Sequence, residues 1–258
     1  MWQGKIKMEI DKKHLEYLSF LHLDPQQEKL SENFGACKNE SMLPSTNRAF
    51  FQNRITIDDI QQLKQFYENK PFTIWLNNTN SEGNKDAEHL GFEKRYSYPF
   101  MLANLKNIGL CQENPLIRVD QITSKNSIIN FWSDLVSTAY NISSTEFKKF
   151  VTYLVSVKKF HGIKFYVGYF NHSPAATSMF IEKDDTVDIH WVGTLPEFRN
   201  KGLGQAVTVL PLQKIKTIHK IKVAILYASA MGEPLYEKIG FSGVGECHVY
   251  GIKNPDQK

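Results

Sequence analysis

The feature that most constrains this chain is a short basic loop with two glycines, placed between an apolar strand and an apolar helix. The segment VDIHWVG (187–193) reads as a strand, and LGQAVTVLPL (203–212) has apolar residues at helical spacing. The loop between them, LPEFRNKGLG (195–204), contains an arginine and a lysine. Backbone N–H groups at a helix start have no partner within the helix, and glycine lets a ligand approach them. The junction therefore predicts an anion site, with phosphate as the natural ligand.

Two well-known phosphate loops do not fit these residues. A P-loop places lysine directly after its last glycine, whereas here Lys201 precedes the glycine. A dinucleotide fingerprint needs a third glycine where Val207 stands, and an acid about 20 residues further on, where Lys222 stands. The remaining pattern is Arg-x-x-Gly-x-Gly, from Arg199 to Gly204, after a strand and a proline.

Composition bounds the class of protein. The 258 residues are 41% hydrophobic and 22% charged, as expected of a soluble globular chain with a real core. No apolar run reaches the roughly 18 to 20 residues of a membrane helix, and the first ten residues lack the apolar stretch of a signal peptide. We expect a cytoplasmic protein, with export left open. Cys37, Cys111 and Cys247 lie far apart without a CxxC pair, so neither a disulfide framework nor a metal site is expected.

Positive charge is concentrated in one part of the chain. The formal net charge of +4 is too small to indicate nucleic-acid binding. Between Pro196 and Lys222, however, six basic residues stand against the single acid Glu197. This basic segment suits an anionic ligand, although a charged helix face is also an ordinary solvated surface.

The first half of the chain predicts helices, strands and one turn-rich loop. Thr56 and Asp59 occupy capping-box positions at the start of the second helix. The elements predicted are helices over 11–23, 56–70 and 85–92, strands over 71–77 and 94–105, a loop over 77–84 and a connection over 106–116.

The second half predicts an alternation of helices and strands. The elements predicted are helices over 126–140, 144–160, from about 203, and over 232–241, and strands over 163–170, 175–181, 186–193, 222–228 and near 245–252, with an acidic turn over 182–185. Pro211 falls inside the helix that follows the basic loop, where it removes one backbone hydrogen bond and should kink the helix.

Two segments share one plan. IWLNNTNSEGNKDAEHLGF (74–92) and ILYASAMGEPLYEKIGF (225–241) each read as an apolar strand, a small polar loop and a short helix that ends in Gly-Phe. We interpret this as a weak internal repeat. Helix endings of this kind are also common C-caps, so the pairing leaves both explanations open.

In its second half the sequence resembles the GNAT N-acetyltransferase superfamily. The resemblance covers about Ile117 to the C-terminus and includes the strand, the Pro-x-x-Arg-x-x-Gly-x-Gly loop, a helix, a strand and the Leu-Tyr-x-x-x-Gly-Phe helix in order. It implies an α/β (α+β) fold with a mixed, mostly antiparallel sheet flanked by helices. It also implies acetyl-coenzyme A as cosubstrate, with the loop amides on its pyrophosphate and the strand along its pantetheine arm. The cofactor-binding residues so implied are Val192, Thr194, Arg199, Asn200, Lys201, Gly202, Leu203, Gly204, Gln205 and Ser229.

The resemblance also suggests catalytic residues. In the family, the tyrosine of the Leu-Tyr helix often protonates the departing thiolate, which here is Tyr236. The residue that would deprotonate the amine is less clear. Some family members have a carboxylate for this step, but the matching position here lies near Thr186, which cannot act as the base. Asp188 and His190 share one face of their strand by the two-residue period. Histidine, with a pKa of about 6.5, is the better-tuned base at neutral pH.

The first half has neither part of this machinery. Aligning the Gly-Phe endings puts Ala87 where Tyr236 stands, and no Arg-x-x-Gly-x-Gly occurs before residue 110. We expect a degenerate GNAT-like half at 1–113, with faint resemblance over about Ile57 to Leu105, and a GNAT domain at 114–258. A plain accessory domain is the competing interpretation of the first half.

Three functional hypotheses follow. The leading one is an acyltransferase that moves acetyl from acetyl-coenzyme A to a primary amine by direct attack in a ternary complex. The second is a coenzyme A-binding pseudoenzyme or scaffold. The third keeps the chemistry but takes a protein lysine or N-terminus as acceptor. No nucleic acid or membrane partner is expected, and neither the acceptor nor the oligomeric state follows from the sequence.

Overall fold

The computed structural model describes residues 29–30, 33–51, 53–68, 70–78, 80–111, 113–156, 162–183, 185–218 and 221–252. These residues form two compact units. The N-terminal unit holds the chain through Tyr98 together with the chain from Val244, and the C-terminal unit runs from Pro99 to Gly243. The helix predicted over 11–23 lies outside the described residues.

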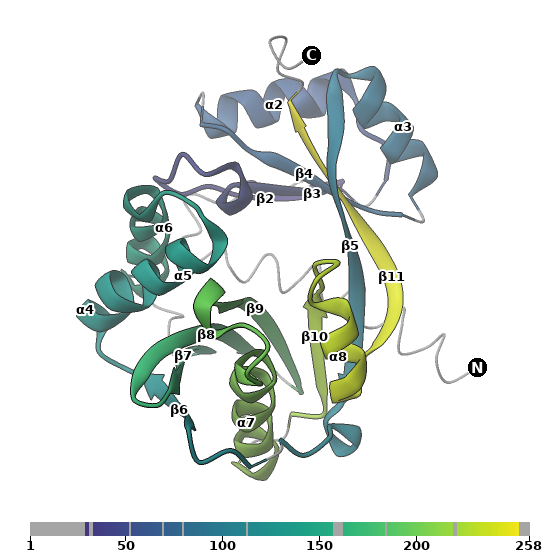
Figure 1. Ribbon diagram of the computed structural model, residues 1–258. Coiled ribbons are helices and arrows are strands. Elements are labelled where there is room, and N and C mark those ends of the chain that lie inside the picture. The colour runs from purple at the N-terminus through teal and green to yellow at the C-terminus, as the bar shows by residue number, and fades with distance from the viewer. Residues whose placement is uncertain are drawn as a thin grey trace. The chain divides into compact units, whose positions relative to one another are not determined.

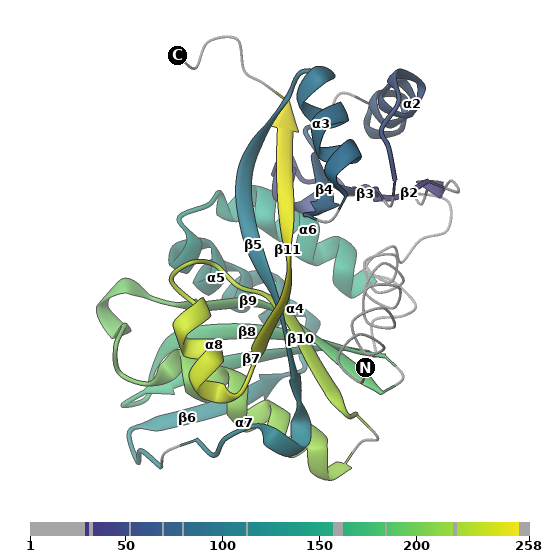
Figure 2. The ribbon, with the colours of Figure 1, turned by 90° about the vertical axis from the view of Figure 1, so that its right-hand side faces the viewer.

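The C-terminal unit is built on a mixed sheet. Its strands, in spatial order, are the end of β5 (Phe92–Asn104), β10 (Val223–Tyr227), β9 (Thr186–Thr194), β8 (Ser173–Lys183), β7 (Ile163–Phe170) and β6 (Ile117–Ile122). Neighbours are antiparallel except β9 and β10, which are parallel. Helices α5 (Ser133–Tyr140) and α6 (Ser144–Ser156) lie on one side of this sheet and α7 (Leu203–Ile218) on the other (Figures 1 and 2). The predicted mixed, mostly antiparallel sheet flanked by helices is confirmed.

Shorter elements complete this unit. They are η2 (Leu105–Asn107), α4 (Lys125–Ser127), the π-helix η3 (Ile128–Trp132), η5 (Pro196–Phe198) and α8 (Glu233–Ile239). The helix predicted over 126–140 is thus a run of α4, η3 and α5 with one wide turn. Its geometry lets the Ser133 hydroxyl donate to the Ile128 carbonyl at 3.1 Å. No strand was predicted for β6, the edge strand.

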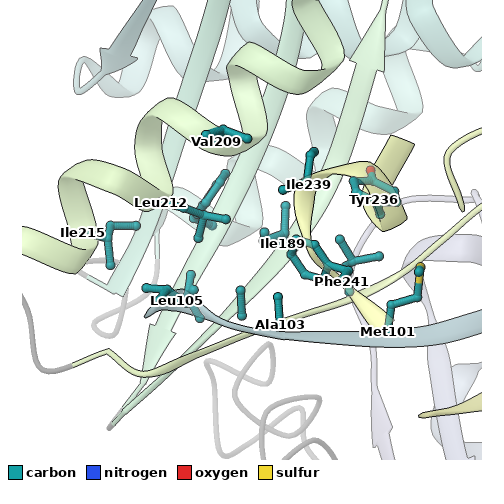
Figure 3. Packing of buried hydrophobic residues seen from close by; sticks show 14 of the residues in the cluster. Met101, Ala103, Leu105, Ile189, Val209, Leu212, Ile215, Tyr236, Ile239 and Phe241 are labelled. Atoms are coloured by element: carbon teal, nitrogen blue, oxygen red, sulfur yellow. The ribbon is translucent and has the colours of Figure 1, made fainter. Parts of the chain in front are cut away.

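Apolar side chains of α7, α8 and the sheet form the core beneath the basic loop. Figure 3 shows Val209 and Leu212 of α7 facing Ile189 of β9, with Tyr236 and Ile239 of α8 beside them. All of these side chains are buried. The helix that follows the loop is therefore anchored along its length by burial of apolar surface, which fixes where its first turn lies.

Pro211 lies in the interior of α7, and the helix continues through it. Because proline has no N–H, the carbonyl of Val207, four residues earlier, loses its helical donor. The buried hydroxyl of Ser178 on β8 donates to that carbonyl at 2.7 Å. A side chain of the sheet thus satisfies the group that the proline leaves open.

The N-terminal unit has a smaller sheet. Its strands, in order, are β1 (Lys29–Leu30), β2 (Phe34–Cys37), β3 (Arg48–Phe51), β4 (Thr73–Asn77), β11 (Ser242–Ile252) from Val244 on, and the start of β5. Neighbours whose register is defined are antiparallel, except β3 and β4, which are parallel. The remaining elements are η1 (Pro44–Thr46), α2 (Ile57–Tyr67) and α3 (Ser81–His89). No strand was predicted for β1, β2 or β3.

One prediction in this unit is wrong. The segment 77–84 was predicted to be a loop, but α3 begins within it at Ser81. The side chain of Asn80 accepts a hydrogen bond from the Gly83 N–H at 2.9 Å and so caps the helix. The polar, turn-forming residues of this segment start a helix because an Asn cap satisfies its first turn.

Both units contain the same succession of elements. A strand, a helix and a second strand parallel to the first (β3, α2, β4 and β9, α7, β10) are followed by a short helix, Gly-Phe and a long antiparallel strand. The long strand that ends each succession pairs with the second parallel strand of the other succession. β11 follows α8 in the chain but pairs with β4, and β5 follows α3 but pairs with β10. Descent of the N-terminal unit from a GNAT domain, and a division of the chain at residue 113, stay predictions.

Candidate active site

The two parallel strands at the centre of the C-terminal unit separate partway along β9. Residues from Thr186 to Ile189 pair with β10, and within the described chain no β10 partner follows Ile189. At the same level β9 bulges against β8, because the register shifts between Thr177 and Met179. Trp191, in the bulge, has a φ of 51°, the left-handed region that a tryptophan rarely adopts. The strands β9 and β10 are thus paired as far as Ile189 and are apart beyond it.

Two hydroxyl groups fix the bulge. Thr177 Oγ1 on β8 donates to the Trp191 carbonyl at 3.0 Å, and Tyr140 Oη at the end of α5 donates to the Val192 carbonyl at 2.9 Å. A side chain at Gly193 would meet Tyr140 Cε2 at 2.9 Å, so only glycine allows this close approach. Tyr140 and Thr177 were not predicted from the sequence, because neither belongs to a local motif.

The basic loop that follows β9 is held by its own side chains. Arg199 Nε donates to the Thr194 carbonyl at 3.3 Å, and Lys201 Nζ donates to the Glu197 carbonyl at 3.0 Å. The ammonium of Lys201 also lies about 5 Å from the ring centroids of Phe170 and Phe198. In this arrangement the arginine and lysine shape the loop, and its backbone is what remains available for a ligand.

The backbone of this loop presents a run of N–H groups at the start of α7. Asn200 and Gly202 have positive φ angles of 61° and 85°, and alternation of this kind turns successive N–H groups toward one point. The first N–H bonded within the helix is that of Ala206, to the Gly202 carbonyl at 3.0 Å. Among the described residues, none accepts a hydrogen bond from the N–H of 202, 203, 204 or 205. These four donors, at the positive end of a 16-residue helix, fit a phosphate group.

A groove of about 710 Å³ runs along one flank of this helix start. Its walls include Lys201, Gly202 and Gln205 on one side and Cys111 and Ile117 on the other. Leu235 of α8 would lie 3.1 Å from a side chain added at position 204. Glycine at position 204 therefore permits α8 to approach the helix start.

Tyr236 projects from α8 into the core of the unit. Its side chain is 7% exposed and meets the ring of Phe241 edge-on at 5.8 Å, with the hydroxyl pointing away from that ring in Figure 3. A side chain at Gly232 would meet the tyrosine ring at 2.9 Å, so glycine one turn earlier makes room for it. Burial raises the pKa of the phenol well above its usual value of about 10. Tyr236 is therefore a protonated donor at neutral pH.

Asp188 and His190 lie together on the other face of the sheet. They stand opposite Ile181 and Met179 of β8, whereas Ile189 stands opposite Phe180 in the core under α7. Oδ2 of the aspartate is 3.0 Å from Nε2 of the histidine, and the two side chains are 2% and 11% exposed. The same-face prediction is confirmed. The structure adds that both residues face away from the side of Tyr236.

The other residues singled out from the sequence have definite positions. Ser229 precedes α8, and its carbonyl accepts from Gly232 N at 2.8 Å and Glu233 N at 2.9 Å, which shapes the turn into that helix. Leu203 is buried against the sheet, so only its backbone can meet a ligand. Within the described ranges no group of three or more His, Cys, Asp or Glu side chains could hold a metal ion. No described helix is both long and apolar enough to span a membrane.

Known structures share this architecture. A GCN5-related N-acetyltransferase from Kribbella flavida superposes with a TM-score of 0.67 at 12% identity, over 88% of this chain and 89% of that chain. One from Sphaerobacter thermophilus gives 0.61 at 11%, over 86% and 76%. A tandem GNAT protein from the clavulanic acid biosynthesis pathway gives 0.58 at 10%, over 94% and 89%. No protein-family model and no curated protein matches the sequence. At these identities the likeness is one of fold, and the chain has the fold of the GCN5-related N-acetyltransferases.

Proposed function

We propose that this protein is an N-acetyltransferase that moves an acetyl group from acetyl-coenzyme A to a primary amine. The observation that carries the proposal is the helix start with four open N–H donors, which directly follows a strand that has separated from its parallel neighbour. The donors suit a pyrophosphate, and the free stretch of strand suits an extended, amide-containing arm. The neighbouring structures with this fold, named as acetyltransferases, support the same conclusion.

The reaction needs a free amine and a protonated leaving group. Acetyl-coenzyme A would supply an activated acyl carbon, whose bond to sulfur breaks as the bond to the amine nitrogen forms. Tyr236, which is protonated at neutral pH, would donate its proton to the departing sulfur. The amine proton would pass to the Asp188–His190 pair, which lies on the other face of the sheet. Donor and acceptor would then enter from opposite faces and meet where β9 and β10 are apart.

The binding residues follow from the same arrangement. The N–H groups of Gly202, Leu203, Gly204 and Gln205 would bind the pyrophosphate, and the backbone of Val192 and Thr194 would lie along the pantetheine arm. Arg199, Asn200 and Lys201 would contribute mainly by shaping the loop, since two of these side chains are bonded to it. No metal is required in this scheme.

Isothermal titration with acetyl-coenzyme A and with coenzyme A, at two salt concentrations, tests the proposal. We expect about one site per chain, weakened by salt because the contacts are to phosphate. Release of free thiol in the presence of a panel of small amines and amine-bearing peptides would then identify the acceptor class. Absence of coenzyme binding would overturn the proposal.

A second candidate is a protein that binds acyl-coenzyme A without turnover. The burial of Asp188, which is 1% exposed, favours it, because a buried carboxylate is poorly placed to meet an amine without some rearrangement. Tight binding without thiol release for any acceptor, including protein lysines and N-termini, would support this alternative over the acetyltransferase.

A further inference from the structure

We propose that Tyr140 is a positioning residue, whose hydroxyl sets the bulge of β9 in the conformation that receives the pantetheine arm. This inference rests on the proposed acetyl transfer and adds to it a residue that no motif marks. Tyr140 lies at the end of α5, far from the basic loop in sequence, and belongs to the same unit as the site.

The first observation is a contact to the free part of β9. Tyr140 Oη donates to the carbonyl of Val192 at 2.9 Å, beyond the last residue of β9 that pairs with β10. A peptide group is planar, so holding this carbonyl also fixes the direction of the N–H of Gly193. A carbonyl oxygen has two lone pairs and can accept from Tyr140 and from a ligand amide together.

The second observation is that the surrounding residues are shaped around this tyrosine. Its ring meets the ring of Trp191 edge-on, with centroids 5.4 Å apart and planes at 79°. Gly193 has no Cβ, and one built there would lie 2.9 Å from the tyrosine ring and 3.0 Å from Ala139 Cβ. The glycine therefore gives the tyrosine its access to the strand.

The third observation is the strained backbone at Trp191, which the hydrogen bond of Tyr140 helps to hold in place. Trp191 has a φ of 51°, a conformation that persists in a bulky residue only where neighbours hold it. Thr177 holds the Trp191 carbonyl from β8 at 3.0 Å, and Tyr140 holds the next carbonyl from α5. Without the tyrosine hydroxyl, the bulge would be fixed from one side only, and the arm would meet a less ordered strand.

The test uses two ligands that share their phosphates and differ in the arm. Acetyl-coenzyme A contains the acetylated pantetheine arm, whereas the arm-free nucleotide adenosine 3′-phosphate 5′-diphosphate ends at the pyrophosphate. Tyr140→Phe keeps the ring and removes the hydroxyl. We expect it to weaken acetyl-coenzyme A binding about fivefold or more and to leave binding of the arm-free nucleotide within about twofold of wild type. Tyr96→Phe, at a tyrosine that is 58% exposed in the other unit, is the matched control and should change neither affinity.

A second variant approaches the same contact from the strand. Gly193→Ala retains the hydroxyl but displaces the tyrosine ring, and it should also weaken acetyl-coenzyme A selectively. Equal weakening of both ligands in either variant would indicate a merely structural role, and unchanged affinity for acetyl-coenzyme A would equally contradict the inference. If the wild type binds the arm-free nucleotide as tightly as acetyl-coenzyme A, the positioning role is wrong while the phosphate site stands. If it binds neither ligand, the proposed function fails, and this inference with it.

Discussion

The two units of this protein share a parallel strand–helix–strand arrangement but differ at the start of the helix, where the N–H groups are capped in one unit and open in the other. In the N-terminal unit, Thr56 caps α2 by accepting from the Asp59 N–H at 3.1 Å, and the Asp59 carboxylate accepts from the Thr56 N–H at 2.9 Å. In the C-terminal unit, α7 begins at glycines, with no acidic residue in its first turn. At the start of α2 the capping box satisfies backbone N–H groups and carries negative charge, whereas the N–H groups of residues 202–205 have no acceptor among the described residues.

The difference shows that a shared succession of elements does not fix a binding site. Asp58 and Asp59 put negative charge where α7 offers only backbone N–H groups, so an anion at α2 would meet both repulsion and occupied donors. The position that matches Tyr236 is Ala87, which is fully buried in the core of its own unit. Both differences fall in the same unit.

The largest expected effect comes from making the start of α7 resemble that of α2. Gly202→Glu puts a carboxylate beside the open N–H groups, and we expect acetyl-coenzyme A affinity to fall about a hundredfold, because phosphate then meets a like charge. Gly91→Glu is a close control, since Gly91 has the same φ of 85° and lies in the other unit. Calorimetry measures both affinities, and similar losses in the two variants would mean that backbone strain, not the site, is responsible.

The second effect concerns Tyr236, which has an alanine at the matching position of the N-terminal unit. Tyr236→Phe should lower kcat between about tenfold and a hundredfold and leave the Kd of acetyl-coenzyme A nearly unchanged, since only a proton donor is lost. Because burial raises the phenol's pKa above about 10, the wild-type rate should show no decline from this group between pH 7 and 10. A loss in rate below about tenfold would contradict the acid role.

The third effect concerns the interior of α7. Ser178→Ala should lower the free energy of unfolding by about 1 to 3 kcal/mol, because the Val207 carbonyl then has no donor. In a Pro211→Ala background the same serine change should cost less, since the alanine N–H can bond to that carbonyl. Denaturant unfolding of the four proteins measures the coupling. Additive costs would show that the serine does not compensate for the proline.

The smallest effect is at the capped helix. Thr56→Ala removes one half of the capping box of α2 and should cost about 1 kcal/mol of stability, measured by the same unfolding experiment. Acetyl-coenzyme A affinity should stay within about twofold of wild type. A large loss of affinity would show that the N-terminal unit takes part in coenzyme binding, which would remove the expected difference between the two units.

Most helices and strands, and the basic glycine-containing loop between β9 and α7, could be predicted, because they depend on neighbours in the chain. The capping box at Thr56 and Asp59, the strand before the basic loop and the glycines at 202 and 204 are all local patterns. The short strands β1 to β3 were missed, because strands of two to four residues hold too little periodicity to be recognised. The start of α3 was misread, because its Asn cap uses the residue types of a turn.

The sequence by itself determined that a helix with unsatisfied N–H groups follows a basic, glycine-containing loop, since backbone conformation there depends on adjacent residues. Only the tertiary structure decided that β9 bulges at Trp191, that Tyr140 and Thr177 hold the bulge, and that Asp188 and Tyr236 lie on opposite faces of the sheet. Those facts depend on strand register and on side chains far apart in the chain. Register is set by packing across strands, a long-range interaction that no local pattern contains.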